Sequence, residues 1–286
     1  MTELKSVLIS GCSSGIGRRV ATGLSAQGYR VFATARGSSD VDMLRASGLE
    51  SVRLDLDDSD SIDGAVAEIL SRTGDRLFGL VNNGAYGQPG AVEDLSREAL
   101  RRQFETNVLG TQELTNRVIP VMRRQGYGRI VQISSVLGFV CLPYRGAYNA
   151  SKFALEALSD TLRLELRGTN IHVSLIEPGP IRSRFRANAY RAFQAYIDAD
   201  ASAHGDAYRH VEKRLLDPSD ARFTLPETAV LTRVQHALAA TRPRIRYRVT
   251  LPTHMFAILK RILPDRWMDS ILGRSIAHEL PPKARQ

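Results

Sequence analysis

The chain has 286 residues, of which 43% are hydrophobic and 24% charged, a composition typical of globular proteins that argues against a disordered or fibrous chain. Its two cysteines, Cys12 and Cys141, provide neither a disulfide framework nor a zinc site, so no metal is expected. No run approaches the roughly 18 apolar residues of a transmembrane helix, and the first ten residues lack the apolar core of a signal peptide. We therefore expect a cytoplasmic protein that is long enough to bury a substantial core.

The first 180 residues alternate short β-rich runs with longer helical ones. Strands are predicted at 6–10, 30–34, 51–56, 77–83, 128–134 and 171–178. Helices are predicted between them at 15–27, 59–72, 96–124 and 147–167. Apolar strands separated by helices indicate a parallel sheet that is covered on both faces. The sequence thus predicts an α/β fold, a single doubly wound domain spanning residues 1–286.

The pattern loosens beyond residue 180. Residues 184–225 are polar, carry scattered aromatic residues and contain no strand pattern, and a helix is predicted to begin at Pro226. Arginines at 242, 244, 246 and 248 alternate with other residues, which is the period of a strand with one charged face. A solvated strand face is favoured over an anion site or a nucleic-acid site. No aromatic-rich RNA-binding signature accompanies the arginines.

The carboxyl-terminal extension, about residues 250–286, is amphipathic and lies in a basic part of the chain. The formal net charge is +9, and residues 242–286 contribute +7 of it through ten Arg or Lys against three Asp or Glu. An apolar helical stripe ends at Pro264, and a second stripe follows. Such stripes could pack on the domain or lie on an anionic membrane. Packing is favoured, because each stripe is short and Asp265 and Asp269 would weaken attraction to anionic lipid.

A glycine-rich turn joins the first predicted strand to the first predicted helix. It reads GCSSGIG and places Gly11, Gly15 and Gly17 just before the helix. Glycines there permit a tight turn and let the pyrophosphate of a dinucleotide approach the backbone at the positive end of the helix. A purely structural turn is the alternative, and nucleotide binding is the favoured interpretation.

Residues 148–152 read YNASK, which places Tyr148 and Lys152 one helical turn apart on one face. A nearby ammonium stabilises a phenolate, so we expect the pKa of Tyr148 to fall below its usual value of about 10. On its own the pair fits an ordinary amphipathic helix better than a functional site. Its meaning depends on the motifs around it.

Five motifs together resemble the short-chain dehydrogenase/reductase family. They are GxxxGxG at the first turn, NNGA at 82–85, Asn107, ISS at 133–135 and YNASK, in the family's order and spacing. The resemblance covers residues 5 to about 184 and is specific. The stretches SGCSSGIG and VFATAR are similar to the branch of hydroxysteroid and retinol dehydrogenases. There are two departures, Ser10 for a threonine and NNGA for the family's Asn-Asn-Ala-Gly. Both keep small residues beside the cofactor, so they put the fine geometry in doubt more than the activity.

The resemblance implies a Rossmann fold with a catalytic set of Asn107, Ser135, Tyr148 and Lys152. Tyr148 would exchange a proton with the substrate oxygen, and Ser135 would hydrogen-bond that oxygen. Lys152 would lower the pKa of the tyrosine and hold the nicotinamide ribose, while Asn107 would hold a water in a proton relay. For Ser135 taken alone, a strand-end serine satisfied by the backbone is the alternative.

The resemblance also implies NADP(H) as the cofactor. Ala35 stands where NAD enzymes place an acid, and Arg36 follows it with a guanidinium that matches a 2′-phosphate. Each of these residues also has a purely structural interpretation. Arg36 could be a solvated loop charge, Asp55 could cap the end of a strand, and residues 178–179 could be a plain Pro-Gly turn. With Arg36, Tyr148 and Lys152, the implied cofactor contacts are Gly11, Ser13, Ser14, Gly15, Ile16, Gly17, Asp55, Leu56, Asn82, Gly84, Pro178, Gly179, Ile181 and Ser183.

The function implied by the resemblance is NADP(H)-dependent interconversion of a secondary alcohol and a ketone or aldehyde. Residues 184–225 would form a substrate lid, whose aromatic residues suit either a bulky apolar substrate or simple packing. Pairing into a homo-dimer or homo-tetramer through the helices near 96–124 and 147–167 is also implied, and nucleic acid is not an expected partner. Two alternatives stay open, a catalytically silent NADP-binding regulator and a lipid oxidoreductase associated with a membrane surface.

Overall fold

A seven-stranded parallel sheet forms the centre of a single α/β domain in the computed structural model, which describes residues 4–275. The strand order is β3-β2-β1-β4-β5-β6-β7. The strands are β1 (Ser6–Ile9), β2 (Arg30–Ala35), β3 (Glu50–Arg53), β4 (Gly79–Asn82), β5 (Gly128–Ile133), β6 (Ile171–Glu177) and β7 (Arg246–Arg248). The predicted doubly wound fold is confirmed, and β7 adds an edge strand from the arginine-rich stretch.

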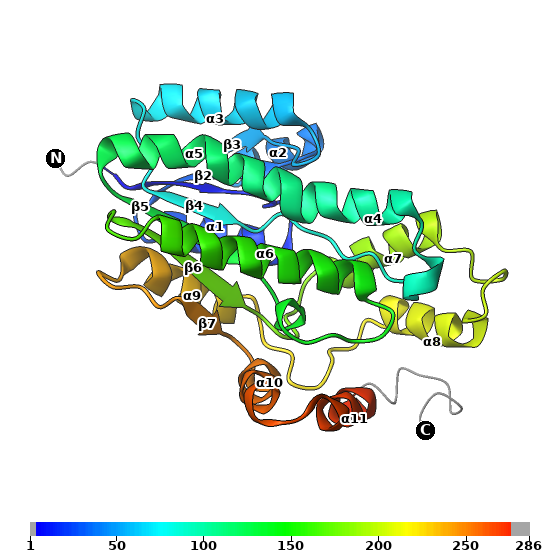
Figure 1. The fold of residues 1–286 in the computed structure, drawn as a ribbon. Helices are drawn as coiled ribbons and strands as arrows, with labels where there is room; N and C mark the ends of the chain where they lie inside the picture. Colours follow the sequence, from blue (N-terminus) through cyan, green and yellow to red (C-terminus); the bar gives the residue numbers. More distant parts are fainter. Residues whose placement is uncertain (1–3, 276–286) are drawn as a thin grey trace.

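Helices cover both faces of the sheet (Figure 1). One face packs on α1 (Gly15–Ser25), α2 (Ser38–Ala46) and α9 (Thr228–Ala239), and the other on α3 (Ser59–Thr73), α5 (Thr111–Gln125) and α6 (Gly146–Glu165). In β1, Val7 and Ile9 belong to the first core, and Leu8 between them belongs to the second. Successive strand residues point to opposite faces, so an unbroken apolar run supplies both cores.

Three helical regions differ from the sequence prediction. The helix predicted at 96–124 consists of α4 (Arg97–Phe104), a π-helical stretch η2 (Glu105–Gly110) and α5. The short helix α2 was not predicted. Residues 184–225 contain α7 (Phe185–Tyr196) and α8 (Gly205–Leu216), which bury Phe193 and Tyr208 together. These two helices depend on packing against each other and the domain, which local pattern does not reveal.

Strand β7 carries ion pairs instead of a solvated charged face. Arg246 lies 2.9 Å from Glu177 of β6. It also contacts Glu156 and Asp160 of α6 at 3.0 and 2.6 Å, while Arg248 reaches the second Glu177 oxygen at 3.4 Å. The Glu177 side chain is only 2% exposed, and a buried carboxylate without a partner would be strongly destabilising. The predicted solvated face is therefore wrong for these two arginines, because carboxylates of β6 and α6 cover it.

Two helices follow β7, α10 (Leu251–Ile262) and α11 (Asp265–Ser275), and Pro264 lies between them as the sequence indicates. Phe256, Met268 and Leu272 are buried in a cluster with Leu137 and Val140. The expected packing of the apolar stripes on the domain is thus confirmed for one side of the pair. Within residues 4–275, no helix combines the length and the apolar character that crossing a membrane requires.

We expect Phe256→Ala to lower the free energy of unfolding by about 3 kcal/mol, since it leaves a cavity between α10 and the loop after β5. Ile258→Ala is the matched control, because Ile258 lies on the same helix but is 59% exposed; it should change stability by less than about 0.5 kcal/mol. Urea denaturation of the full chain measures both. Equal losses in the two variants would contradict the packing described for α10.

Candidate active site

The carboxyl ends of four strands bring the sequence motifs to one edge of the sheet. The strand order reverses between β1 and β4, and ligands of open α/β sheets bind at such a point. The glycine loop follows β1, the NNGA motif begins at the end of β4, the ISS motif ends β5, and the EPGPIRS stretch starts at the end of β6. Stretches that are far apart in the chain therefore face one another.

The glycine loop is built for close approach of another group to the backbone. Gly11 and Gly15 have φ angles of +70° and +54°, which L side chains rarely adopt. A Cβ at Gly17 would lie 2.2 Å from the carbonyl oxygen of Gly11. Helix α1 begins at Gly15, its N-cap Ser14 makes no side-chain cap, and no acid lies in its first turn. The positive end of α1 is thus available to an anion such as a pyrophosphate.

A hydrogen-bond network joins the glycine loop to the NNGA motif. Asn83 donates through Nδ2 to the carbonyls of Ser10 and Gly11 at 3.0 and 2.8 Å. Ser10 Oγ accepts from the backbone N–H groups of Asn83 and Gly84 at 3.0 and 2.9 Å. By contrast, Asn82 turns its side chain into the interior, where it donates to Thr115 Oγ1 at 2.8 Å. Asn83 was not among the predicted site residues, although its place as the second asparagine of NNGA was the available signal.

Helix α6 places Tyr148 beside Ser135 and Lys152. The phenol lies close to the Ser135 hydroxyl, whose Oγ accepts from the backbone N–H of Leu137 at 3.1 Å. Lys152 is 3% exposed and donates through Nζ to the carbonyl of Ile133 at 2.8 Å. The ammonium lies 5.8 Å from the centre of the tyrosine ring. Three of the four predicted catalytic side chains therefore meet at the end of β5.

Burial, and not the lysine, dominates the pKa of Tyr148. It raises the pKa of the phenol to about 12, while the hydrogen bond with Ser135 acts in the opposite direction. Burial also lowers the pKa of Lys152 to about 8, and the nearby carboxylate of Glu156 opposes that change. The expectation of a lowered tyrosine pKa is thus wrong for the protein chain, since desolvation outweighs an ammonium that is directed at the Ile133 carbonyl.

Asn107 lies in the π-helical stretch η2, which turns its amide toward the site. Its Oδ1 accepts from the backbone N–H of Tyr86 at 3.1 Å, and its Nδ2 donates to the Tyr86 carbonyl at 2.9 Å and to Ser151 Oγ at 3.1 Å. Ser151 in turn donates to the backbone carbonyl of Tyr148 at 2.8 Å. Asn107 is thereby fixed next to α6, and π-bulges of this kind are frequent at functional sites.

Basic residues gather where β2 and β3 end. Ala35 is buried, and the exposed Arg36 follows it. Arg53, the last residue of β3, donates through Nε to the carbonyl of Arg36 at 3.2 Å and was not among the predicted residues. Asp55 accepts from the backbone N–H of Asp57 at 3.2 Å, so it also shapes the turn before α3. Leu56 is buried beside Gly84.

The stretch after β6 folds over the glycine loop. The Pro178 carbonyl accepts from Val136 at 2.7 Å, and a Cβ on Gly179 would lie 2.1 Å from Thr250 Oγ1. Ile181 pairs with Leu225 through the backbone groups of its two neighbours, which leaves its own N–H and C=O outside this pairing. A Cβ on Gly15 would lie 3.1 Å from that of Ser183. Ser183 therefore stands directly against the loop.

An aromatic residue covers Tyr148 from outside. Phe185, the first residue of α7, meets the Tyr148 ring edge to face, with 5.2 Å between ring centres. Gly87 lies against both rings, since a Cβ there would be 2.7 Å from Phe185 and 3.5 Å from Tyr148. With Leu137 and Val140 packed nearby, the surroundings of the phenol are mainly apolar. Such surroundings suit an apolar substrate.

A polar network anchors α7 and α8 to the domain. Tyr208 of α8 accepts from the backbone N–H of Ala91 at 2.9 Å and hydrogen-bonds with Asp94. Ser202 donates to Asp94 at 2.6 Å, and His204 contacts Glu93. Glu93 and Asp94 lie in the short 3-10 helix η1 (Val92–Asp94). These contacts tie α8 and the loop before it to η1, and α7 packs on α8 through Phe193 and Tyr208.

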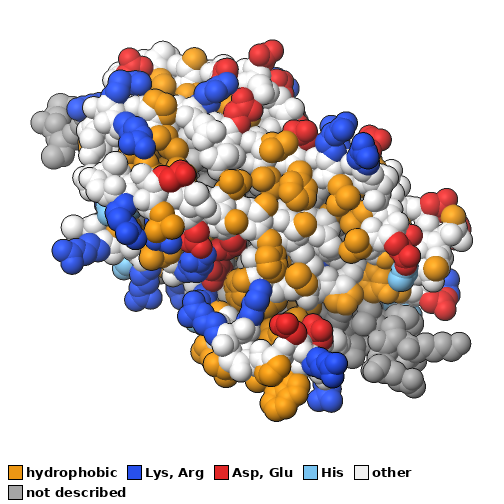
Figure 2. All heavy atoms as spheres, viewed as in Figure 1, with side chains coloured by type: hydrophobic (Ala, Val, Ile, Leu, Met, Phe, Trp, Pro, Cys, Tyr) orange, Lys and Arg blue, Asp and Glu red, His pale blue; other side chains and the backbone are white. Residues whose placement is uncertain are grey.

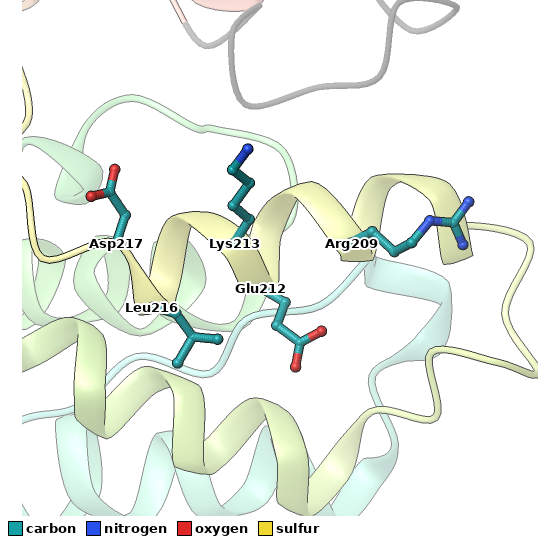
Figure 3. Close-up of a pocket in the computed structure, with 5 residues that line it drawn as sticks. All are labelled: Arg209, Glu212, Lys213, Leu216 and Asp217. Atoms are coloured by element: carbon teal, nitrogen blue, oxygen red, sulfur yellow. The ribbon is translucent and has the colours of Figure 1, made fainter.

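A shallow depression on α8 is separate from this arrangement. Its lining is Arg209, Glu212, Lys213, Leu216 and Asp217 (Figure 3). None of these is a predicted site residue, and Glu212 is already engaged by the hydroxyl of Tyr190 at 2.9 Å. The mixed charges of this surface select no class of ligand.

The family model for short chain dehydrogenases matches residues 5–193. The chain belongs to this family. It is 45% identical to "Uncharacterized oxidoreductase YbbO" of Escherichia coli (strain K12) over 268 residues, 94% of each chain. It is 32% identical to mouse retinol dehydrogenase 5, covering 93% of this chain and 87% of the relative. It is also 32% identical to bovine 17-beta-hydroxysteroid dehydrogenase type 6, covering 95% and 88%. The predicted family and branch are confirmed.

Solved structures of the family share the fold. A short-chain dehydrogenase from Streptomyces avermitilis has a TM-score of 0.76 at 27% identity, covering 96% of this chain and 99% of that one. An actinorhodin polyketide ketoreductase solved with NADPH has a TM-score of 0.71 at 27% identity, covering 87% and 97%. A Burkholderia phymatum family member in complex with NAD has a TM-score of 0.76 at 26% identity, covering 95% and 96%. The chain is thus an oxidoreductase of this family by both sequence and fold.

Lys152→Met tests the burial of the ammonium. The pKa of Lys152 is lowered from 10.5 to about 8 in the folded protein, so between these values the unfolded chain binds more protons and stability rises with pH. The variant lacks this group, so wild type should gain up to about 3 kcal/mol in free energy of unfolding relative to it from pH 8 to pH 10.5. Chemical denaturation at both ends of this window measures the gain, with Lys213→Met on α8 as the exposed control. A constant difference would contradict the buried charge.

Proposed function

We propose that the chain is an NADP(H)-dependent oxidoreductase that interconverts a secondary alcohol and a ketone or aldehyde, with Tyr148 as the general acid and base. The observation that carries the proposal is the contact of the Tyr148 phenol with Ser135, one helical turn from Lys152. These groups stand at the edge of the sheet that carries the glycine loop. Proton transfer to a substrate oxygen needs this phenol and hydroxyl pair.

The raised pKa of Tyr148 suits an acid in the direction of reduction. A phenol with a pKa of about 12 keeps its proton at neutral pH and delivers it to the oxygen that becomes an alcohol. Ser135 hydrogen-bonds the same oxygen and stabilises its developing charge. Lys152 would hold the ribose hydroxyls of the cofactor, and Asn107 would support a water on the proton path. The bound nicotinamide supplies or accepts the hydride.

The residues of the glycine loop fit a dinucleotide. The pyrophosphate would lie against Gly11, Gly15 and Gly17 at the uncapped start of α1, flanked by Ser13, Ser14, Ile16 and Ser183. Asp55, Leu56, Asn82 and Gly84 would hold the adenosine half, and Pro178, Gly179 and Ile181 would hold the nicotinamide. Arg36, with an alanine in place of an acid before it, favours NADP(H) over NAD(H).

A bulky apolar substrate fits the apolar surroundings of Tyr148. Phe185, Leu137 and Val140 lie about the phenol, and residues 184–225 with α7 and α8 form the lid. The relatives named for retinol and for a 17-beta-hydroxysteroid support this substrate class. The cytoplasm is the proposed location.

A dimer or tetramer is proposed through α4, α5 and α6. Leucines of α4, η2 and α6 are exposed, namely Leu100, Leu109, Leu158 and Leu164. A symmetric pairing would bury this face against its own copy.

Tyr148→Phe removes the acidic proton and keeps the ring. We expect turnover of a carbonyl substrate to fall by at least about 1,000-fold, in line with the loss of acid–base catalysis, while the dissociation constant for NADPH stays within about threefold. Stopped-flow NADPH consumption and fluorescence titration measure the two. Turnover at the wild-type rate would refute the assigned acid, and loss of NADPH binding would show that the variant damages the site as a whole.

Arg36→Ala removes the proposed partner of the 2′-phosphate. A charge-assisted contact is worth roughly 1.5–3 kcal/mol, so NADPH affinity should fall about 10- to 100-fold while NADH affinity changes little. Measuring the same two affinities in Arg53→Ala shows whether the neighbouring guanidinium contributes. Arg124→Ala, at the end of α5, is the distant control. An unchanged ratio of NADPH to NADH affinity in Arg36→Ala would make the cofactor assignment wrong.

A further inference from the structure

Helix α10 has a second apolar side that faces away from the domain. Phe256 and Ala257 are buried, whereas Leu251, Met255, Ile258 and Ile262 are 44–67% exposed. The spacing of these four residues places them on one face of the helix. Together with Trp267 of α11, which is 65% exposed, they are called the outer ridge. Five large exposed apolar side chains on two consecutive helices exceed the scattered exposure of an ordinary surface.

Cations lie along the outer ridge. Arg261 and Arg266 are exposed, and Arg274 follows Trp267 by two turns on the same side of α11. Lys260 is on the other side of α10, since its Nζ donates to the Phe139 carbonyl and lies over the Phe153 ring. Figure 2 shows hydrophobic side chains along the outer edge of the α10 and α11 segment, with basic side chains beside them.

The acids of α11 do not share the side of the ridge. At about 100° per residue, Asp265 and Asp269 lie roughly opposite Trp267 and Arg274 around the helix. From the sequence alone, these acids argue against binding to anionic lipid. In the structure, Met268 and Leu272 are buried against the domain, and on the helix they lie between the two acids and Trp267. The face that carries Trp267 is therefore apolar and basic.

We propose that the outer ridge seats the protein on an anionic lipid bilayer. Apolar side chains with a tryptophan and flanking arginines are the composition of helices that lie in a membrane interface. Helices α10 and α11, which carry the ridge, project from the rest of the domain (Figure 1), so their outer side can meet a flat surface. A second copy of the chain fits less well, because a symmetric contact would bring the same arginines together.

The inner side of the α10 and α11 pair packs near Tyr148, so a bilayer on the outer side would lie close to the candidate active site. Phe256, Met268 and Leu272 belong to the cluster against which Tyr148 packs. A bilayer under the outer ridge therefore lies one helix layer away from the phenol, and apolar molecules dissolved in it have a short path to the site. The membrane contact itself does not rest on the proposed function, and binding measurements test it without turnover.

The chain contains one tryptophan, Trp267, so its fluorescence reports the ridge directly. Vesicles of phosphatidylglycerol and phosphatidylcholine should shift the emission of the full-length protein to shorter wavelength, and brominated lipid should quench it. Co-sedimentation should be at least tenfold weaker with pure phosphatidylcholine vesicles, and added salt should weaken binding to the anionic ones.

Two variants and one control separate the ridge from general effects. Ile258→Ser with Ile262→Ser removes apolar contact, and Arg261→Glu with Arg266→Glu reverses charge; each pair should lower co-sedimentation at least tenfold at an unchanged melting temperature. Met43→Ser on α2 replaces another exposed side chain, 50% exposed, and should bind as wild type.

Absence of an emission shift with anionic vesicles would overturn the proposal, as would equal binding by the two ridge variants and wild type. A shift that follows protein concentration without vesicles, together with a doubled mass by light scattering that Ile258→Ser with Ile262→Ser abolishes, would assign the ridge to a second copy of the chain instead.

Discussion

Burial of the Lys152 ammonium is the constraint on which the candidate site depends. A cation at 3% exposure is tolerated only where a carbonyl and nearby negative charge compensate for lost hydration, and Ile133 and Glu156 supply these. Glu156 must then be compensated in turn, which Arg246 does from β7. A line of alternating charge therefore runs along α6 from Lys152, next to the Tyr148 phenol, to the edge strand β7.

These charges link β7, the last strand of the sheet, to the helix that carries Tyr148 and Lys152. Arg246 holds Glu156 and Asp160 of α6 together with Glu177 of β6, so β7 fixes α6 in the direction that keeps Tyr148 against Ser135. The basic stretch at the end of the chain, which looks like surface charge, is in part an internal counter-charge. The main effect of its arginines is to hold β6, β7 and α6 in place. Their ion pairs add little net stability, because in a buried pair the cost of desolvation offsets much of the attraction.

Helices α10 and α11, which follow β7, each have a buried apolar side and an exposed apolar side. One side closes the apolar cluster that includes Leu137 and Tyr148, and the other presents Trp267 and its neighbours to the outside. A single apolar stripe either packs on the domain or contacts another surface. A helix pair with two apolar sides can do both. Thr250, just before α10, lies against Gly179, and this contact keeps the pair attached to the loop after β6.

Much of the architecture was readable from local pattern. Six strands, the turn at Gly11–Gly17 and the i, i+4 relation of Tyr148 and Lys152 follow from periods of two and 3.6 residues and from the steric freedom of glycine. Helices α2, α7 and α8 were not readable, because short polar helices owe their stability to packing partners distant in sequence.

Tertiary structure alone decided the environment of each group. The phenol of Tyr148 has a raised pKa because burial, which no spacing reveals, outweighs the neighbouring lysine. The side chain of Asn83, and not that of Asn82, contacts the glycine loop, since the end of β4 turns one asparagine inward. The sequence determined which chemical groups are present and how they are spaced; desolvation and direction, which depend on atoms from distant segments, were set by the fold.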